Sequence, residues 1–236
     1  MVKKEHLLAE EKIEKSKLIK SLLFPVFFVL FVWLVKLFEI YFEISLVHYG
    51  LFPQNFTGLR GIIFMPLIHG SFEHLGNNTI PILVLGTAIF YFYREVAYKI
   101  IVLSWILGGL WLWFTSPGVY HIGASGLIYA WASFLFFSGV IRTNKNLLAI
   151  SLLVIFLYGS MVWGLFPIKE GISWEGHLMG SLAGGLLAYY YKDYGPRKKI
   201  PEWMEEKEDE DEDDIDYSWI EDGEWKQDNQ NNEGYK

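Results

Sequence analysis

The chain has 236 residues, of which 52% are hydrophobic and 18% aromatic, and its formal net charge is −7. An acidic balance argues against nucleic acid as a partner, because phosphate binding needs a basic surface. The sequence has no cysteine, which excludes disulfides, thiolate catalysis and thiolate metal sites. Long apolar runs dominate residues 22–192, whereas residues 201–236 are almost all polar or acidic, so the net charge describes the tail rather than the body.

The chain opens with a charged segment, residues 1–20, which precedes the first apolar run. That run is too long for a cleaved signal peptide, and no small-residue cleavage site follows it. We therefore expect it to remain as a membrane helix, with Pro25 close to the helix start, where proline costs little.

Apolar segments of membrane-spanning length recur along the body of the chain. A bilayer core about 30 Å thick needs about 20 apolar residues per helix. Six segments reach or approach that length: 21–45, 75–93, 98–115, 125–141, 146–166 and 174–191. The sequence thus predicts an all-α polytopic membrane protein. Its six transmembrane helices occupy 21–193, between a cytoplasmic segment at 1–20 and a tail at 194–236.

Lysine and arginine in the short loops predict the orientation, because these residues are enriched on the cytoplasmic side. They gather in the leading segment and after the second, fourth and sixth spans, whereas the other side carries only Arg60 and Lys169. We therefore expect both termini in the cytoplasm and the loop 46–73 outside. The expected location is the plasma (inner) membrane.

The tail differs from the body in composition. It opens with Gly195-Pro196 and a basic cluster, and an acidic run follows at 205–216. Such a charge block cannot bury enough apolar area to fold, so we expect a disordered acidic tail. Three tryptophans leave open a short binding segment whose partner the sequence does not identify: Trp203, Trp219 and Trp225.

Three polar residues on different spans fall at one depth. Ser125, His177 and Asn78 precede the basic residue at the cytoplasmic end of their spans by 17, 15 and 16 residues. These separations correspond to roughly 22–26 Å of helix, so the three side chains share one layer near the outer surface. Polar groups at membrane depth are costly and usually functional.

Ser125 lies in the stretch Gly123-Ala124-Ser125-Gly126, which favours a helix beginning near the serine. Unpaired N–H groups at a helix start can stabilise the oxyanion that forms when a serine attacks an amide. The glycines permit a sharp turn and close approach of a substrate. The alternative is a plain helix start with the serine as its N-cap.

His177 precedes Gly180 and Gly184, which continue from Gly176 as a ladder of small residues typical of touching membrane helices. The histidine should therefore face a neighbouring helix, where it can act as base for a serine. No acidic third member is evident, so a Ser–His dyad is the simplest arrangement. Tyr129, one turn after the serine, could orient the imidazole. Plain structural roles stay open for both the histidine and the tyrosine.

Several polar residues at the start of the second span suggest a path for water from outside: His69, Ser71, Glu73, His74 and Asn77. The alternative is a polar loop at headgroup level. The five-residue spacing of the two histidines suits neither a helical pair nor a short zinc motif, so we expect no metal and no other cofactor.

Three motifs together resemble the rhomboid family of intramembrane serine proteases. They are His69 followed by His74-x-x-x-Asn78, Gly-Ala-Ser125-Gly followed by Tyr129, and His177-x-x-Gly180-x-x-x-Gly184. The resemblance covers about residues 20–193 and implies a rhomboid-like bundle that cleaves transmembrane protein substrates near the outer membrane edge. It further implies that Ser125 is the nucleophile, His177 the general base, and Asn78, His74 and the Ser125 N–H the oxyanion site, beside Gly123.

The resemblance also implies a movable fifth span, here 146–166, and a cap at 167–173. One departure is Leu59-Arg60, where many members carry Trp-Arg.

Two other function classes remain open: a non-catalytic relative that binds membrane helices, and a transporter or channel. Lys36, Glu39 and Glu43 are the nearest charges to those that a transporter needs, although they fit the outer end of a tilted first span better.

Overall fold

The computed structural model describes residues 2–116, 118–157, 163–168 and 173–196. Within these residues the chain is helical, and the only β-type pairing is an isolated antiparallel bridge between Leu51 and His121. The all-α prediction is therefore confirmed for the described part of the chain. Residues 158–162 of the predicted fifth span, residues 169–172 of the predicted cap and the residues beyond 196 lie outside the described residues.

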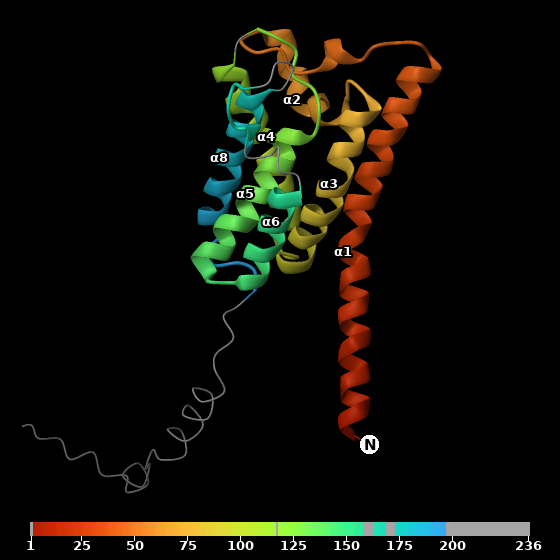
Figure 1. The fold of residues 1–236 in the computed structure, drawn as a ribbon, viewed down its shortest axis with the longest axis vertical. Helices are drawn as coiled ribbons and strands as arrows, with labels where there is room; N and C mark the ends of the chain where they lie inside the picture. Colours follow the sequence, from red (N-terminus) through yellow and green to blue (C-terminus); the bar gives the residue numbers. More distant parts are fainter. Residues whose placement is uncertain (1, 117, 158–162, 169–172, 197–236) are drawn as a thin grey trace, which may run out of the picture. The chain divides into compact units, whose positions relative to one another are not determined.

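Helices follow one another along the chain, joined by mostly short loops (Figure 1). The long helices are α1 (Val2–Tyr41), α3 (Phe72–Phe92), α4 (Ala97–Thr115), α5 (Ser125–Arg142), α6 (Lys145–Leu157) and α8 (Trp174–Tyr190). Between α1 and α3 the chain forms four short helical pieces: η1 (Val47–Tyr49), η2 (Phe56–Arg60), α2 (Gly61–Phe64) and η3 (Met65–Leu67).

Among the described residues, four helices are long and apolar enough to cross a membrane by length and composition: α1 from His6 onward, α3, α4 and α5. The described part of α6 has 13 residues and α8 has 17, so the six-span count is not confirmed. The predicted starts and ends of the second, third, fourth and sixth spans lie within three residues of α3, α4, α5 and α8.

The prediction for Pro25 was wrong. The helix does not begin near Pro25, because α1 runs through it as one helix of 40 residues that begins at Val2. The lysines and glutamates before residue 20 are good helix formers, so they continue the apolar helix upstream. The buried Pro25 ring packs against Gly86 of α3, where a Cβ would lie 2.9 Å from the ring. The missing side chain at Gly86 makes room for this proline.

The centre of the bundle is α5, which contacts α3, α4, α6 and α8. Trp131 and Phe134 of α5 are fully buried, and the Trp131 indole N–H donates to Ser104 Oγ of α4 at 3.2 Å. In Figure 1, α5 and α8 lie side by side, and α3 lies between this part of the bundle and α1. The helix that begins at Ser125 is thus fixed from several sides.

The loop before α3 is held against the bundle by hydrogen bonds. Trp105 Nε1 of α4 donates to the carbonyl of Ile62 at 2.7 Å. Arg60 donates to the carbonyl of His48 at 2.9 Å and lies over the Tyr49 ring. Arg60, which follows Leu59, thus fastens this loop to itself.

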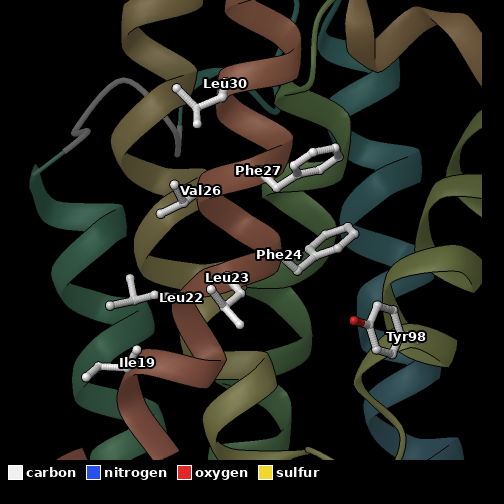
Figure 2. A pocket seen from close by; sticks show the side chains of 8 residues that line it. All are labelled: Ile19, Leu22, Leu23, Phe24, Val26, Phe27, Leu30 and Tyr98. Carbon is white, nitrogen blue, oxygen red and sulfur yellow. The ribbon is translucent and has the colours of Figure 1, made fainter. Parts of the chain in front are cut away.

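An apolar hollow runs along α1, remote in sequence from Ser125 and His177 (Figure 2). It is lined by side chains of α1 between Ile19 and Leu30 and by Tyr98 of α4. Leu23 and Phe27 are 65% and 70% exposed, which suits contact with lipid chains rather than water. No polar side chain of the predicted site lines this hollow.

Candidate active site

Ser125 is the first residue of α5, as the glycine-rich stretch before it predicted. Gly123 has φ +102°, a left-handed conformation that a side chain would strain. A Cβ there would also lie 2.5 Å from His74 Cε1 and 2.6 Å from His74 Nε2. Glycine therefore lets the chain turn into α5 while the His74 imidazole lies directly against the peptide before the serine.

His177 lies in the first turn of α8, whose N-cap is Ser173. The glycines that follow His177 in α8 pack against α5: a Cβ on Gly180 would overlap the carbonyl oxygen of Gly126. A Cβ on Gly184 would overlap the carbonyl oxygen of Ala130 in the same way. The two backbones thus approach as closely as small residues allow. As a result, His177 Nε2 lies 2.8 Å from Ser125 Oγ.

The imidazole of His177 is held on two further sides. Its Nδ1 lies 2.8 Å from the carbonyl oxygen of Gly164, which can only accept a hydrogen bond. Nδ1 therefore carries the proton, and Nε2 is left to accept the hydroxyl proton of Ser125. The Tyr129 ring stacks on the imidazole with centroids 4.1 Å apart and planes 9° apart. The arrangement presents a base in the correct tautomer to a serine hydroxyl.

Three polar side chains outside the Ser125–His177 pair lie around the backbone just before Ser125. Asn78 Nδ2 lies 2.8 Å from His69 Nε2, and the backbone N–H of Ala124 donates to the same nitrogen at 3.4 Å. An amide nitrogen has two hydrogens, so Asn78 keeps one N–H for another acceptor. The structure thus brings Asn78, His74 and His69 together around residues 123–125.

The neutral form of His69 follows from its surroundings. Both groups at Nε2 are N–H donors, so this nitrogen accepts and cannot itself carry a proton. Burial, with smaller contributions from His74 and Lys36, lowers the pKa of His69 from 6.5 to about 3. Its 1% exposure agrees with that direction. His69 therefore acts as a neutral hydrogen-bond acceptor that holds Asn78 and Ala124.

Two charged residues of α1, Lys36 and Glu39, form a pair next to the backbone of His69. Lys36 Nζ donates to the carbonyl of His69 at 2.9 Å and pairs with Glu39 at 3.3 Å. Glu39, 5% exposed, accepts from the backbone N–H of Leu46 at 2.8 Å. The two charges thus bind each other and the loop backbone, which accounts for their presence near the C-terminal end of α1.

The residues that predicted a path for water differ in exposure. Ser71, Glu73 and Asn77 are exposed, His74 is half-buried, and His69 is buried. Ser71 also caps α3 by accepting from the backbone N–H of His74 at 3.1 Å. Among the described residues, no group of three or more histidine, cysteine, aspartate and glutamate side chains is placed to hold a metal ion.

Comparison with known proteins identifies the family. A sequence model described as the Rhomboid domain matches residues 57–194. An uncharacterized protein of Mycobacterium tuberculosis is 39% identical over 171 residues, which cover 69% of this chain and 71% of the relative. The chain belongs to the rhomboid family. A second relative, an uncharacterized protein of Mycobacterium leprae, is 35% identical over 172 residues, 69% of this chain and 68% of the relative.

Membership of the rhomboid family confirms the resemblance on which the sequence analysis relied. With its apolar helices, this rhomboid protein is an integral membrane protein. The family consists in general of intramembrane serine proteases, but the names of these relatives state no activity. The roles of individual residues therefore depend on the site itself.

Sequence reasoning missed two features of this rhomboid site. The Gly164 carbonyl, which fixes the tautomer of His177, is a backbone group and leaves no signal in the sequence. The second feature is His121, which the sequence analysis did not single out. A histidine in an apolar context four residues before Ser125 could have indicated it. Glu175, two residues before His177, is not the group at Nδ1, which is the Gly164 carbonyl.

Proposed function

We propose that this protein is an intramembrane serine protease that hydrolyses peptide bonds of transmembrane proteins with a Ser125–His177 dyad. The observation that carries the proposal is the 2.8 Å contact between Ser125 Oγ and His177 Nε2. It is supported by the Gly164 carbonyl at Nδ1, which leaves Nε2 free to act as the base.

In the proposed reaction, Ser125 Oγ attacks the substrate carbonyl carbon while His177 Nε2 takes the hydroxyl proton. His177 then gives this proton to the leaving amine nitrogen, and an acyl-serine remains. A water molecule attacks the acyl carbon, His177 takes its proton, and the proton returns to Ser125 as the acid product leaves. The remaining N–H of Asn78, the His74 imidazole and the Ser125 N–H stabilise the oxyanion.

The proposed topology puts both termini in the cytoplasm of a cell whose plasma (inner) membrane holds the protein. Its support is the distribution of lysine and arginine along the sequence. The six spans then include α6 and α8, and the dyad lies near the outer membrane face. Substrate helices reach it from the bilayer, past a movable fifth span at 146–166 and a cap at 167–173.

Two alternatives compete with the proposal. A non-catalytic relative that binds membrane helices has no need for the serine–histidine contact, which this chain retains. A transporter needs charges with access to a pathway, but Lys36 and Glu39 are occupied with each other and with the loop backbone. Both observations favour the protease.

The test is cleavage of a labelled transmembrane substrate by the full chain reconstituted in vesicles. We expect cleavage by wild type and by Ser133→Ala, and none by Ser125→Ala or His177→Ala. Ser133 is a matched control, because it lies on the same helix and donates to the Ser181 carbonyl at 2.7 Å. A fluorophosphonate should label Ser125 only when His177 is present. Equal cleavage by wild type and Ser125→Ala would refute the proposal.

A further inference from the structure

A buried imidazole outside the dyad joins the loops above the site. His121 is 3% exposed, and its Nε2 lies 2.8 Å from Ser116 Oγ at the end of α4. Its Nδ1 lies 2.6 Å from Ser173 Oγ, which precedes α8. The backbone of His121 exchanges two hydrogen bonds with Leu51, of 2.8 and 3.0 Å. One residue therefore contacts three separate segments of the chain.

His121 links its own segment, which leads into α5 and Ser125, with the segment that leads into α8 and His177. His121 lies four residues before Ser125, and Gly123 between them makes the turn into α5. On the other side, Ser173 is the N-cap of α8: its hydroxyl accepts from the Gly176 N–H at 3.3 Å. Its carbonyl accepts from the backbone N–H of His177 at 3.2 Å. The His121 imidazole is thus hydrogen-bonded to Ser173, the N-cap of the helical turn that contains His177.

We propose that His121 is a positioning residue, which aligns His177 with Ser125 by holding the Ser173 cap in place. The inference rests on the proposed function for its effect on rate. The physical reason is that an N-cap hydroxyl fixes the first helical turn only while the hydroxyl itself is fixed. His177 is in that turn, and misplacement of a catalytic group by about 1 Å costs on the order of 100-fold in rate.

The two serines that contact the imidazole have different expected importance. Ser173 leads to the turn that carries His177, whereas Ser116 ends α4 and leads away from the dyad. A purely structural anchor would depend on both contacts alike. A positioning residue depends on Ser173, and the comparison of the two serines separates these roles.

The experiment measures the rate constant of fluorophosphonate labelling at Ser125, at saturating probe, for the full chain in detergent. We expect His121→Ala and Ser173→Ala each to lower it about 10- to 100-fold, and Ser116→Ala to lower it less than about threefold. The double variant His121→Ala/Ser173→Ala should be no slower than the slower single variant. His121→Asn, whose amide reaches the position of Nδ1, should recover most of the rate.

An exposed histidine of the same loops, His48, provides the matched control, and His48→Ala should label at the wild-type rate. The inference would be overturned if the fold-losses of labelling rate in the two single variants multiplied in the double variant. Equal losses of rate for Ser116→Ala and Ser173→Ala would also overturn it. So would a His121→Ala protein that labels like wild type.

Hydrogen exchange separates this inference from the proposed function. The amides of Gly176 and His177 should exchange faster in His121→Ala than in wild type, while those in the second half of α8 stay protected. If wild type is not labelled at Ser125 but this exchange is seen, the protease proposal fails and the coupling of His121 to α8 stands. Unchanged exchange at Gly176 and His177 would refute the coupling whatever the activity.

Discussion

The close contact between α5 and α8 predicts that a single methyl group added at Gly180 separates Ser125 from His177. In Gly180→Ala the new Cβ would fall more than 1 Å inside the 3.4 Å at which ordinary contact with the Gly126 carbonyl oxygen begins. The obstacle is the backbone of a helix rather than a flexible side chain, so the two helices must separate by about 1 Å. The 2.8 Å contact of Ser125 and His177 would then lengthen beyond hydrogen-bonding distance.

Gly180→Ala should therefore lower the rate of fluorophosphonate labelling about 100-fold. The clash should also destabilise the fold by about 1–3 kcal/mol, partly offset by the better helix propensity of alanine. Labelling rate and thermal unfolding in detergent measure the two effects.

The control is Gly185→Ala on the same helix, where a Cβ meets Phe137 at an ordinary 3.5 Å. It should label like wild type and be more stable by up to about 1 kcal/mol. If Gly180→Ala is folded and labels as fast as Gly185→Ala, the close approach of α5 and α8 does not align the dyad.

Three further predictions concern the surroundings of the site. Tyr129→Leu should slow labelling about 2- to 10-fold, because stacked rings contribute about 0.5–1.5 kcal/mol, while Tyr129→Phe should retain the wild-type rate. Lys36→Met should destabilise the protein by about 3 kcal/mol, because it leaves the Glu39 carboxylate buried without its partner. The double variant Lys36→Met/Glu39→Leu should be less destabilised than Lys36→Met. Losses of stability that add up in the double variant would contradict this. The lowered pKa of His69, about 3 against 6.5 when unfolded, means that its stabilising contribution is complete above pH 6.5 and is lost as pH falls towards 3. Wild type should therefore lose about 2 kcal/mol more than His69→Gln between pH 7 and pH 5, and equal losses in thermal unfolding would show that His69 does not titrate in this way.

The sequence by itself determined four helices of the bundle and pointed to the residues of the candidate site. Apolar runs set α3, α4, α5 and α8 to within three residues, because a membrane helix must satisfy its backbone within the segment. Glycine spacing indicated the faces that touch, and the depth of Ser125 and His177 placed both at one level. These are local properties, which periodicity and composition record.

Only the tertiary structure decided which groups complete the site. The Gly164 carbonyl lies 13 residues before His177, and a backbone carbonyl has the same chemistry in every residue, so no sequence pattern marks it. The sequence also does not indicate that Lys36 donates to the carbonyl of His69, 33 residues away. Pro25 lies inside α1, and the space for its ring comes from Gly86 on another helix. Such contacts depend on how helices pack, which the order of residues along one helix does not specify.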